Sequence, residues 1–274
     1  MKQVSIIIPL FNQTALLNQT LLCLEQQTWK DFEILIVDNA SDSPLSIPET
    51  CKKLDLKYLY LKKNHYYAQA VNLGISLTGT NRILILNSDV HLNKDYLHEL
   101  LEVFNRDATI QCAHGLLLDT KGNVDSCGIR TGLCLQPVDV KHIDRPWEGP
   151  PGASFMISRD LCENLIERYG SVLDSDISFY YSDLAFACRL NEQGMKSLLV
   201  KNASGIHHRS SSVLMKKTPL LLFTYPKLSP EFKKLLMENR RSFKKKYFRF
   251  SKHSWRIPFI VLYDLMTICL KKTG

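Results

Sequence analysis

Residues Arg82–Leu92 read R-I-L-I-L-N-S-D-V-H-L, and they decide how the rest of the chain is interpreted. The first five residues are rich in aliphatic side chains, as in a strand buried on both faces. The run stops at the polar cluster Asn87, Ser88 and Asp89. Because ligands of open α/β sheets bind outside the carboxyl ends of the strands, Asp89 is predicted to hold a divalent cation and, through it, a phosphate. Taken alone, the cluster also fits a simple turn.

Two earlier segments have the same design. Val4–Pro9 is an apolar, β-branched run, and Phe11 and Asn12 come directly after it. Glu33–Asp38 is a second predicted strand whose last residue is a carboxylate, with Ser41 close behind. The carboxyl ends of parallel strands meet at one edge of a sheet, so these polar residues are expected beside the cluster that contains Asp89.

Helical patterns alternate with the strands. One helix is predicted from Thr14, as its capping residue, to Gln27, and a second over Tyr66–Leu77. Further strands are predicted over 57–61, 110–118 and 197–201, and further helices over 93–104, over 158–169 and from 183 onward. Residues 119–150 show no clear pattern. The alternation predicts an α/β fold, with a mostly parallel sheet flanked by helices and joined by right-handed crossovers.

Charge is unevenly distributed along the chain. Residues 213–274 hold 15 Lys and Arg against three acidic residues, a balance of +12; the whole chain carries +8, so residues 1–212 carry −4. The sequence therefore predicts a catalytic domain over residues 1–212 and a basic, aromatic-rich helical extension over residues 213–274.

The extension admits two interpretations. Its apolar end, Ile257–Leu270, is shorter than the roughly 20 apolar residues that span a bilayer. Basic and aromatic side chains followed by an apolar segment fit an interfacial anchor on an anionic membrane. They equally fit a helix that packs on the domain and leaves its basic face in solvent. No recognition motif for nucleic acid accompanies the charge, so nucleic acid is not an expected partner.

Cysteine usage and the N-terminal residues bear on the compartment. Eight cysteines are scattered singly without a C-x-x-C pair, which argues against a zinc site and indicates a reducing environment. The first residues run directly into a strand and form no secretory signal. We therefore expect a cytoplasmic protein, peripheral on the cytoplasmic face of the membrane if the extension is an anchor.

Several motifs follow one another in a recognisable order. They read V-S-I-I-I-P-L-F-N (4–12), I-L-I-V-D-N-A-S-D (34–42), N-H-Y-Y-A-Q-A-V-N-L-G-I (64–75), I-L-I-L-N-S-D-V (83–90), P-G-A-S-F (151–155), F-Y-Y-S-D-L (179–184) and I-H-H-R-S-S-S (206–212). Together they resemble the family 2 glycosyltransferases with a GT-A fold, in particular the bacterial rhamnosyltransferase type. The chain departs from that pattern at Tyr66, Ser182 and Ala185, where the family usually has glycine and acidic residues.

The resemblance implies a site for each reactant. The implied nucleotide-binding residues are Pro9, Phe11, Asn12, Asp38, Ser41, Asn64, Asn72, Asn87 and Ser88. The implied acceptor-binding residues are Gly152, Ala153, Ser154, Tyr180 and Tyr181. Asp89 and His207 are the implied metal ligands, and strand alternation places His207, rather than His208, on the same face as Gly205. Asp183 is the implied catalytic residue.

Three carboxylates would carry the chemistry. Asp38 can accept the N3–H of uracil or thymine, and it also fits an Asx turn with Ser41. Asp89 and His207 can hold Mn²⁺ or Mg²⁺ against the diphosphate, and an imidazole ligand favours Mn²⁺. Asp183 can accept the proton of an attacking hydroxyl. It also fits a structural carboxylate at a helix N-terminus, where the dipole is expected to keep its pKa low.

The predicted function is inverting, metal-dependent transfer of a sugar from a UDP- or dTDP-sugar to a hydroxyl of a glycan or lipid-linked acceptor, in the synthesis of a cell-surface polysaccharide or glycoconjugate. A nucleotidyltransferase would also place carboxylates at strand ends, but residues 9–12 lack a glycine-rich phosphate loop. A non-catalytic basic protein that binds membrane or nucleic acid would explain the extension and leave the strand-end carboxylates unexplained.

Overall fold

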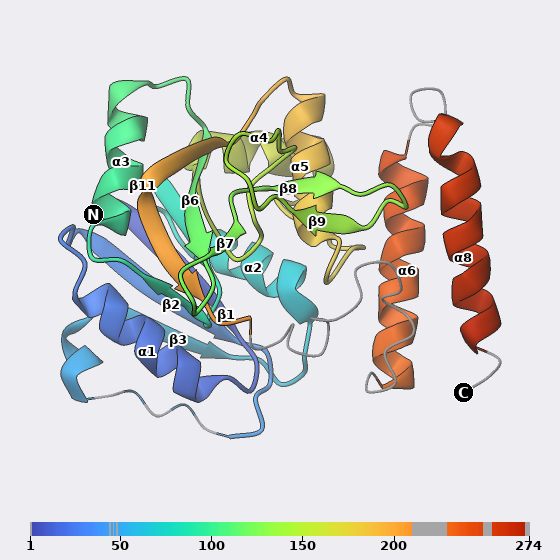
Figure 1. The fold of residues 1–274 in the computed structure, drawn as a ribbon. Coiled ribbons are helices and arrows are strands. Elements are labelled where there is room, and N and C mark those ends of the chain that lie inside the picture. The colour runs from blue at the N-terminus through green and yellow to red at the C-terminus, as the bar shows by residue number, and fades with distance from the viewer. Residues whose placement is uncertain are drawn as a thin grey trace.

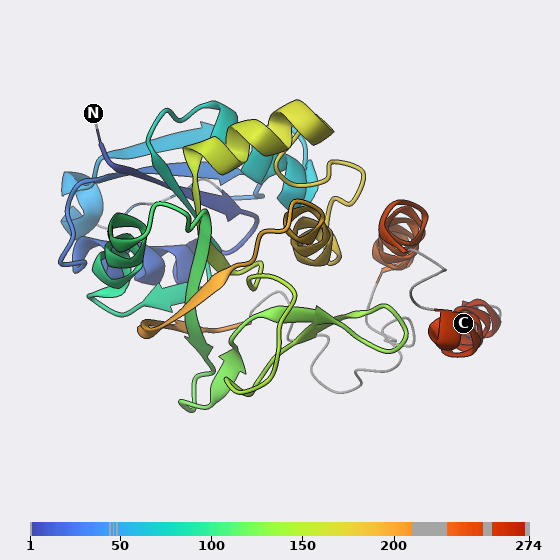
Figure 2. The same cartoon turned by 90° about the horizontal axis from the view of Figure 1, so that it is seen from above.

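The computed structural model describes residues 2–209, apart from 44, 46 and 48, together with residues 229–248 and 254–271. One mixed sheet lies between two layers of helices, and two further helices lie side by side at the edge of the molecule (Figure 1, Figure 2). The expected boundary at 212/213 and the end of the last motif, 210–212, lie outside the described residues.

The main sheet has the order β3-β2-β1-β4-β10-β6-β11-β5, and β7 pairs with β6. Its strands are β1 (Val4–Leu10), β2 (Phe32–Asp38), β3 (Leu56–Tyr60), β4 (Arg82–Leu86), β5 (Val90–Leu92), β6 (Cys112–Leu118), β7 (Val124–Ser126), β10 (Ser154–Ser158) and β11 (Leu198–His207). The run from β3 to β4 is parallel, as is the pair β6 and β11, whereas β10 lies antiparallel between β4 and β6. The predicted mostly parallel α/β sheet is confirmed.

Helices cover both faces of this sheet. They are α1 (Thr14–Glu25) and α3 (Tyr96–Arg106) on one face, and α2 (Tyr66–Ser76), α4 (Arg159–Tyr169) and α5 (Ser182–Glu192) on the other. Strand β1 shows why both faces need a cover. Its Ile6 and Ile8 pack in the core with α1 and α3, whereas Ile7 packs in the core with α2, α4 and α5. Each fully buried aliphatic side chain contributes about 1.5–3 kcal/mol.

The remaining elements lie outside these layers. They are the short helix η1 (Glu49–Lys53), the hairpin of β8 (Ile129–Thr131) and β9 (Pro137–Asp139), the helix α6 (Pro230–Tyr247), the short helix η4 (Ser254–Arg256) and the helix α8 (Ile257–Lys271). The tip of the β8–β9 hairpin reaches both α6 and α8: Cys134 packs with Leu236 and Tyr263, and Leu135 packs with Ile260 (Figure 1). Among the described ranges, no helix is long and apolar enough to cross a membrane.

Three predicted boundaries are wrong. Thr14 is the first residue of α1 and not its cap, and the helix ends at Glu25 because Gln27 has another role: its amide donates to Asn93 O and accepts from Leu97 N. The strand predicted over 197–201 continues to His207. A bulge restores its pairing with β6, and its end also pairs with β5.

Candidate active site

Strained backbone gathers at the carboxyl edge of the sheet. Among the described residues, five of the six non-glycine residues with positive φ lie after β1, β2 and β11 or at the start of α2 and shortly before α5: Asn12 (54°), Ala40 (66°), Arg209 (50°), Tyr66 (61°) and Tyr180 (66°). The sixth, Leu135 (63°), lies in the turn between β8 and β9. Such conformations cost on the order of 1–3 kcal/mol each and cluster at functional sites. The loops at this edge are therefore the first place to look for one.

The loops after β1 and β2 are bonded to each other. Asn12 donates from its backbone N–H to Ser41 Oγ (2.9 Å), and its side-chain amide exchanges two hydrogen bonds with Asp42. Asp38 is fully buried and accepts from Ser41 N (2.8 Å) and Tyr58 Oη (2.7 Å). The Asx turn that the sequence allowed is therefore formed. Pro9 lies within β1, and Phe11 is 46% exposed.

The start of α2 is fastened to the end of β2. The side chain of Asn39, which sequence reasoning missed, accepts from His65 N and donates to Tyr66 O (3.1 and 3.0 Å). Asn64 caps the same turn by accepting from Tyr66 N (2.7 Å). Asn72 lies elsewhere: its amide bonds both the N–H and the carbonyl of Leu173. Asn72 thus holds a loop in this structure, and it does not meet the other implied nucleotide-binding residues.

The cluster at the end of β4 is held from both sides. The N–H of Asn87 donates to Ala153 O, and Ser88 Oγ donates to Gln13 Oε1 (2.8 Å each). Asp89 is 2% exposed, and its Oδ1 lies 3.6 Å from His207 Nε2. The two implied metal ligands, 118 positions apart in sequence numbering, are therefore brought together by the pairing of β11 with β5.

A third residue orients His207. Its Nδ1 lies 3.0 Å from Asp125 Oδ2, so the imidazole presents Nε2 toward Asp89. A carboxylate behind a histidine in this way fixes the tautomer of a metal ligand. His208 points elsewhere, with Nε2 2.8 Å from His91 Nδ1. The geometry supports His207 over His208 as the ligand, as strand alternation predicted.

Arg209 links Asp125, the residue that orients His207, to Asp139 of β9. Its Nε donates to both oxygens of Asp125 (2.7 and 2.6 Å), and its Nη2 donates to Asp139 (2.5 Å). Burial alone would lower the pKa of Arg209, but the two carboxylates raise it, so the guanidinium stays charged. Asp125, Asp139 and Arg209 carry no sequence signal that would have identified them.

Asp183 is the second residue of α5. Its Oδ1 accepts from Leu184 N (2.8 Å), and a Cβ placed on Gly152 would lie 3.0 Å from the Asp183 Cβ, so a side chain at position 152 would crowd Asp183. Burial raises the pKa of Asp183 to about 7, with the charge of Asp139 adding to the rise. The expected low pKa is therefore wrong, because desolvation outweighs the helix terminus.

The other implied acceptor residues divide into two groups. Gly152 and Ala153 lie at the site, between Asp183 and the backbone of Asn87. Ser154 and Tyr181 are core residues instead. Ser154 is fully buried and bonds Tyr96 Oη, and Tyr181 is 1% exposed with its ring against Phe243. Tyr180 is partly buried and stacks edge-on against Tyr181.

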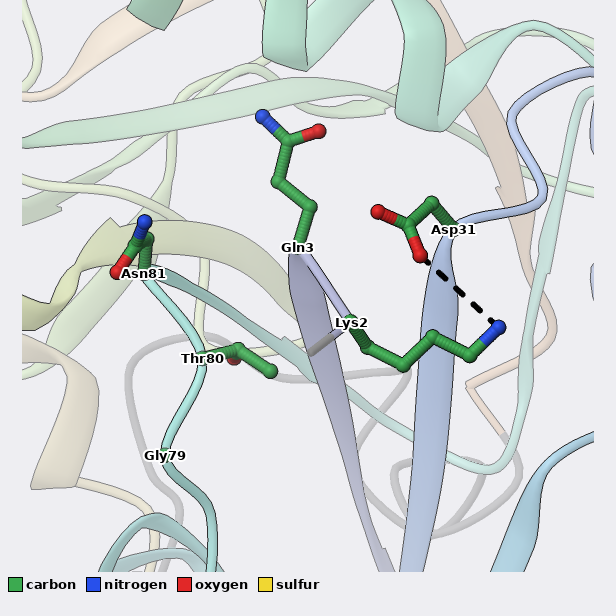
Figure 3. Close-up of a pocket in the computed structure, with 6 residues that line it drawn as sticks. All are labelled: Lys2, Gln3, Asp31, Gly79, Thr80 and Asn81. Atoms are coloured by element: carbon green, nitrogen blue, oxygen red, sulfur yellow. Dashed lines mark ion pairs between the residues drawn. The ribbon is translucent and has the colours of Figure 1, made fainter.

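A hollow of about 380 Å³ lies at the other end of the strands. It is lined by residues that precede β1, β2 and β4, namely Lys2, Gln3, Asp31, Gly79, Thr80 and Asn81 (Figure 3). Lys2 and Asp31 form an ion pair across it at 3.9 Å. The hollow is at the amino ends of the strands and contains none of the residues described above, so it is not part of the candidate site.

Comparison with known proteins identifies the family. The model of glycosyl transferase family 2 matches residues 5–165, more than half of the chain. The chain belongs to glycosyl transferase family 2. It is 38% identical over 106 residues to a hyaluronan synthase of Pasteurella multocida, covering 36% of this chain and 11% of that one. It is 25% identical over 189 residues to the low-salt glycan biosynthesis hexosyltransferase of Haloferax volcanii, covering 65% and 59%. The chain thus spans less than two thirds of these relatives.

Solved structures show the same fold. Staphylococcus aureus TarS 1-349 in complex with UDP-GlcNAc has a TM-score of 0.57 at 16% identity, covering 96% of this chain and 72% of that one. The mannosyltransferase PcManGT of Pyrobaculum calidifontis, in complex with GDP-Man and Mn²⁺, has a TM-score of 0.56 at 14% identity, covering 98% and 75%. At these identities the likeness concerns the fold, and the expected GT-A fold is confirmed.

Proposed function

We propose that this family 2 glycosyltransferase is inverting and metal-dependent, and that it transfers a sugar from a UDP- or dTDP-sugar to a hydroxyl of a glycan or lipid-linked acceptor in polysaccharide or glycoconjugate synthesis. The observation that carries the proposal is the pairing of Asp89 with His207 at the carboxyl edge of one GT-A sheet, where Asp125 and Arg209 link this pair to Asp139, whose charge acts on Asp183. Relatives named for glycan synthesis and neighbours bound to nucleotide sugars support it.

The donor set fits a divalent cation. Asp89 offers a carboxylate and His207 a neutral nitrogen, with their facing atoms 3.6 Å apart and the far nitrogen of His207 held by Asp125. No three His, Cys, Asp or Glu side chains gather as a complete metal site among the residues that the structure describes. Asp89 and His207 would therefore hold the ion together with the donor diphosphate, as is usual for ions that bind phosphates. When bound, the ion neutralises the charge of the leaving diphosphate.

Asp183 supplies the proton acceptor in this proposal. A base with a pKa near 7 is about half ionised at neutral pH and is strong enough to take the hydroxyl proton. Attack from the face opposite the departing diphosphate inverts the anomeric carbon. Because Gly152 has no side chain, the Asp183 carboxylate can lie close to the acceptor segment.

The donor half of the proposal is tested by binding. In Mn²⁺, we expect UDP- or dTDP-sugars to raise the melting temperature more than GDP-mannose does. Asp38→Ala should weaken UDP or dTDP binding by about 1–3 kcal/mol, the cost of stranding a buried hydrogen-bonding partner. Isothermal titration calorimetry measures this directly.

Tyr58→Phe is the matched control, because it removes the bond that Asp38 accepts and leaves the carboxylate in place. If Asp38 contacts the base, the control should bind nucleotide within about threefold of wild type. Equal losses in the two variants, or no loss in Asp38→Ala, would show that Asp38 only holds the turn.

Peripheral membrane contact is a separate part of the proposal. One side of α8 packs inward through Ile260 and Tyr263, whereas Phe259, Leu262 and Leu265 are 43%, 58% and 53% exposed. An exposed apolar helix face beside a basic helix suits the surface of an anionic bilayer.

We expect the protein to cosediment with anionic liposomes at low salt and to be released as salt rises. Leu262→Ser combined with Leu265→Ser should reduce the fraction of protein bound to liposomes severalfold, since each substitution removes apolar area that the bilayer would otherwise bury. Removal of residues 213–274 would be a poor test, because Arg240 and Phe243 of α6 are buried against the domain. Absence of any liposome binding by the intact chain would leave packing on the domain as the role of this region.

A further inference from the structure

Helix α6 is bonded to the segment that leads into Asp183. Asn239 Nδ2 donates to Phe179 O (2.6 Å), and Arg240 Nη1 donates to Tyr181 Oη (3.1 Å). Asn239 is 2% exposed and Arg240 is 4% exposed, so both bonds are shielded from water. The residue between the two anchored positions, Tyr180, has the strained φ of 66°. Two buried side chains of α6 thus hold the strained segment 179–181, which ends two residues before the proposed base.

The same guanidinium is also bonded to the turn between β8 and β9. Arg240 Nη1 also donates to the carbonyl of Cys134 (2.7 Å), which lies in the turn between β8 and β9. Strand β9 ends at Asp139, the carboxylate whose charge acts on Asp183. Arg240 is itself held by Asp264 of α8, whose Oδ1 accepts from Nε at 2.8 Å, and it lies over the Tyr263 ring at 4.5 Å. One side chain is therefore bonded to both segments that lead to Asp183 and Asp139.

We infer that Arg240 is a positioning residue for the transfer reaction. By holding residues 179–181 and the β8–β9 turn at a fixed separation, it sets the place of the Asp183 carboxylate relative to Asp139 and the acceptor. The inference rests on the proposed role of Asp183 as the base. A misplacement of about 1 Å can cost on the order of 10²-fold in rate, even when the substituted residue is remote from the reacting atoms.

The charges around Asp183 determine what loosening this contact would do. Asp139 faces it from β9 and raises its pKa, Arg209 lowers it, and the phenols of Tyr67 and Tyr180 interact with it from α2 and from the preceding segment. If residues 179–181 and the β8–β9 turn separate, water reaches the Asp183 carboxylate and Asp139 moves away from it. Both changes lower the pKa of Asp183. The acid limb of the pH–rate profile should then move to lower pH.

The experiment compares Arg240→Met with Lys244→Met in the full chain. Lys244 lies one turn along α6 and also pairs with Asp264, but no bond joins it to Tyr181 or Cys134 among the described residues. We expect Arg240→Met to lower kcat by about 10–100-fold at saturating donor and acceptor. The nucleotide affinity of Arg240→Met should stay within about twofold of wild type, and the acid limb of its pH–rate profile should move to lower pH. Lys244→Met should keep kcat within about twofold, and Arg240→Lys should recover part of the lost rate.

Melting temperatures and circular dichroism separate positioning from unfolding. The inference is overturned if Arg240→Met is folded at the assay temperature and keeps the wild-type turnover. It is also overturned if Arg240→Met loses no more rate than Lys244→Met does. Asp183→Asn is measured in the same series. If Asp183→Asn keeps its turnover, the proposed base is wrong. If it loses turnover while Arg240→Met does not, only the positioning role fails.

Discussion

Asp183→Asn should lower turnover by about 10²–10⁴-fold, the usual contribution of a general base. Asparagine keeps the shape of the side chain and can still accept from Leu184 N, as Asp183 does at 2.8 Å. It cannot take a proton from the acceptor hydroxyl. Nucleotide affinity should hardly change, because Asp183 bonds Leu184 N and lies beside Gly152 of the acceptor segment, whereas the nucleotide is assigned to Asp38 and Asp89. Steady-state kinetics with saturating donor, together with calorimetry of nucleotide binding, measures both quantities.

The pH dependence adds an independent check. Because burial raises the pKa of Asp183 to about 7, the base is protonated, and therefore inactive, at acidic pH. We expect kcat of wild type to rise through about pH 7 and to level off above it, and we expect Asp183→Asn to lose this limb. Asp176, exposed and paired with Lys246, provides a control carboxylate, and Asp176→Asn should keep both the rate and the profile. A variant at 183 that loses nucleotide affinity together with turnover would point to a structural role instead.

Asp89→Ala should abolish Mn²⁺-dependent nucleotide binding. The variant removes the buried carboxylate that faces His207, and a single neutral imidazole cannot hold the ion and the diphosphate together. His207→Ala should weaken the same binding strongly. Asp125→Asn should lower metal affinity by about 10–100-fold, the usual cost of losing the group that orients a ligating histidine. Titration of nucleotide with and without Mn²⁺ provides the comparison.

His208→Ala is the matched control for the metal site. Its ring bonds His91, and its bond to Asp89 is made by the backbone N–H, which the substitution keeps. Metal-dependent binding should therefore survive in this variant. Transfer that continues unchanged in excess chelator would remove the metal from the mechanism, whatever the variants do.

The sheet could be predicted from the sequence because its strands are buried on both faces. The run from Arg82 to Leu86 forms β4 with the predicted bounds, and all but its first residue are buried. Polar residues at or just after the end of a buried strand mark the carboxyl edge of the sheet, and this pattern is why Asp38 and Asp89 could be predicted as site residues. His207 was implied beside Asp89, but the partner of Asp38 was not found. Tyr58 meets Asp38 from the edge strand β3, and no spacing in the chain indicates that contact.

The acceptor side was harder to predict for a physical reason. Strands β7, β8 and β9 are three residues long, so they contain too few positions to show an alternation. They carry Asp125 and Asp139, whose partner Arg209 lies 84 and 70 positions away.

The role of the basic extension could not be decided from composition. Arg240 appeared to be one positive charge among 15, yet it is buried and bonded to Asp264. Composition counts charges without regard to how they are paired. Packing of α6 on the domain, one of the two interpretations left open by the sequence, is what the structure has.

The bridge made by Arg209 limits how this enzyme could be redesigned. Its guanidinium is bonded at one end to Asp125, which orients the proposed metal ligand, and at the other to Asp139, which acts on the proposed base. Grafting residues 124–139 from a relative, in order to accept a different sugar, would replace both carboxylates at once. The graft would alter donor use as well as acceptor choice. Specificity for the two substrates would then have to be selected together in a directed-evolution library, with Arg209 kept fixed.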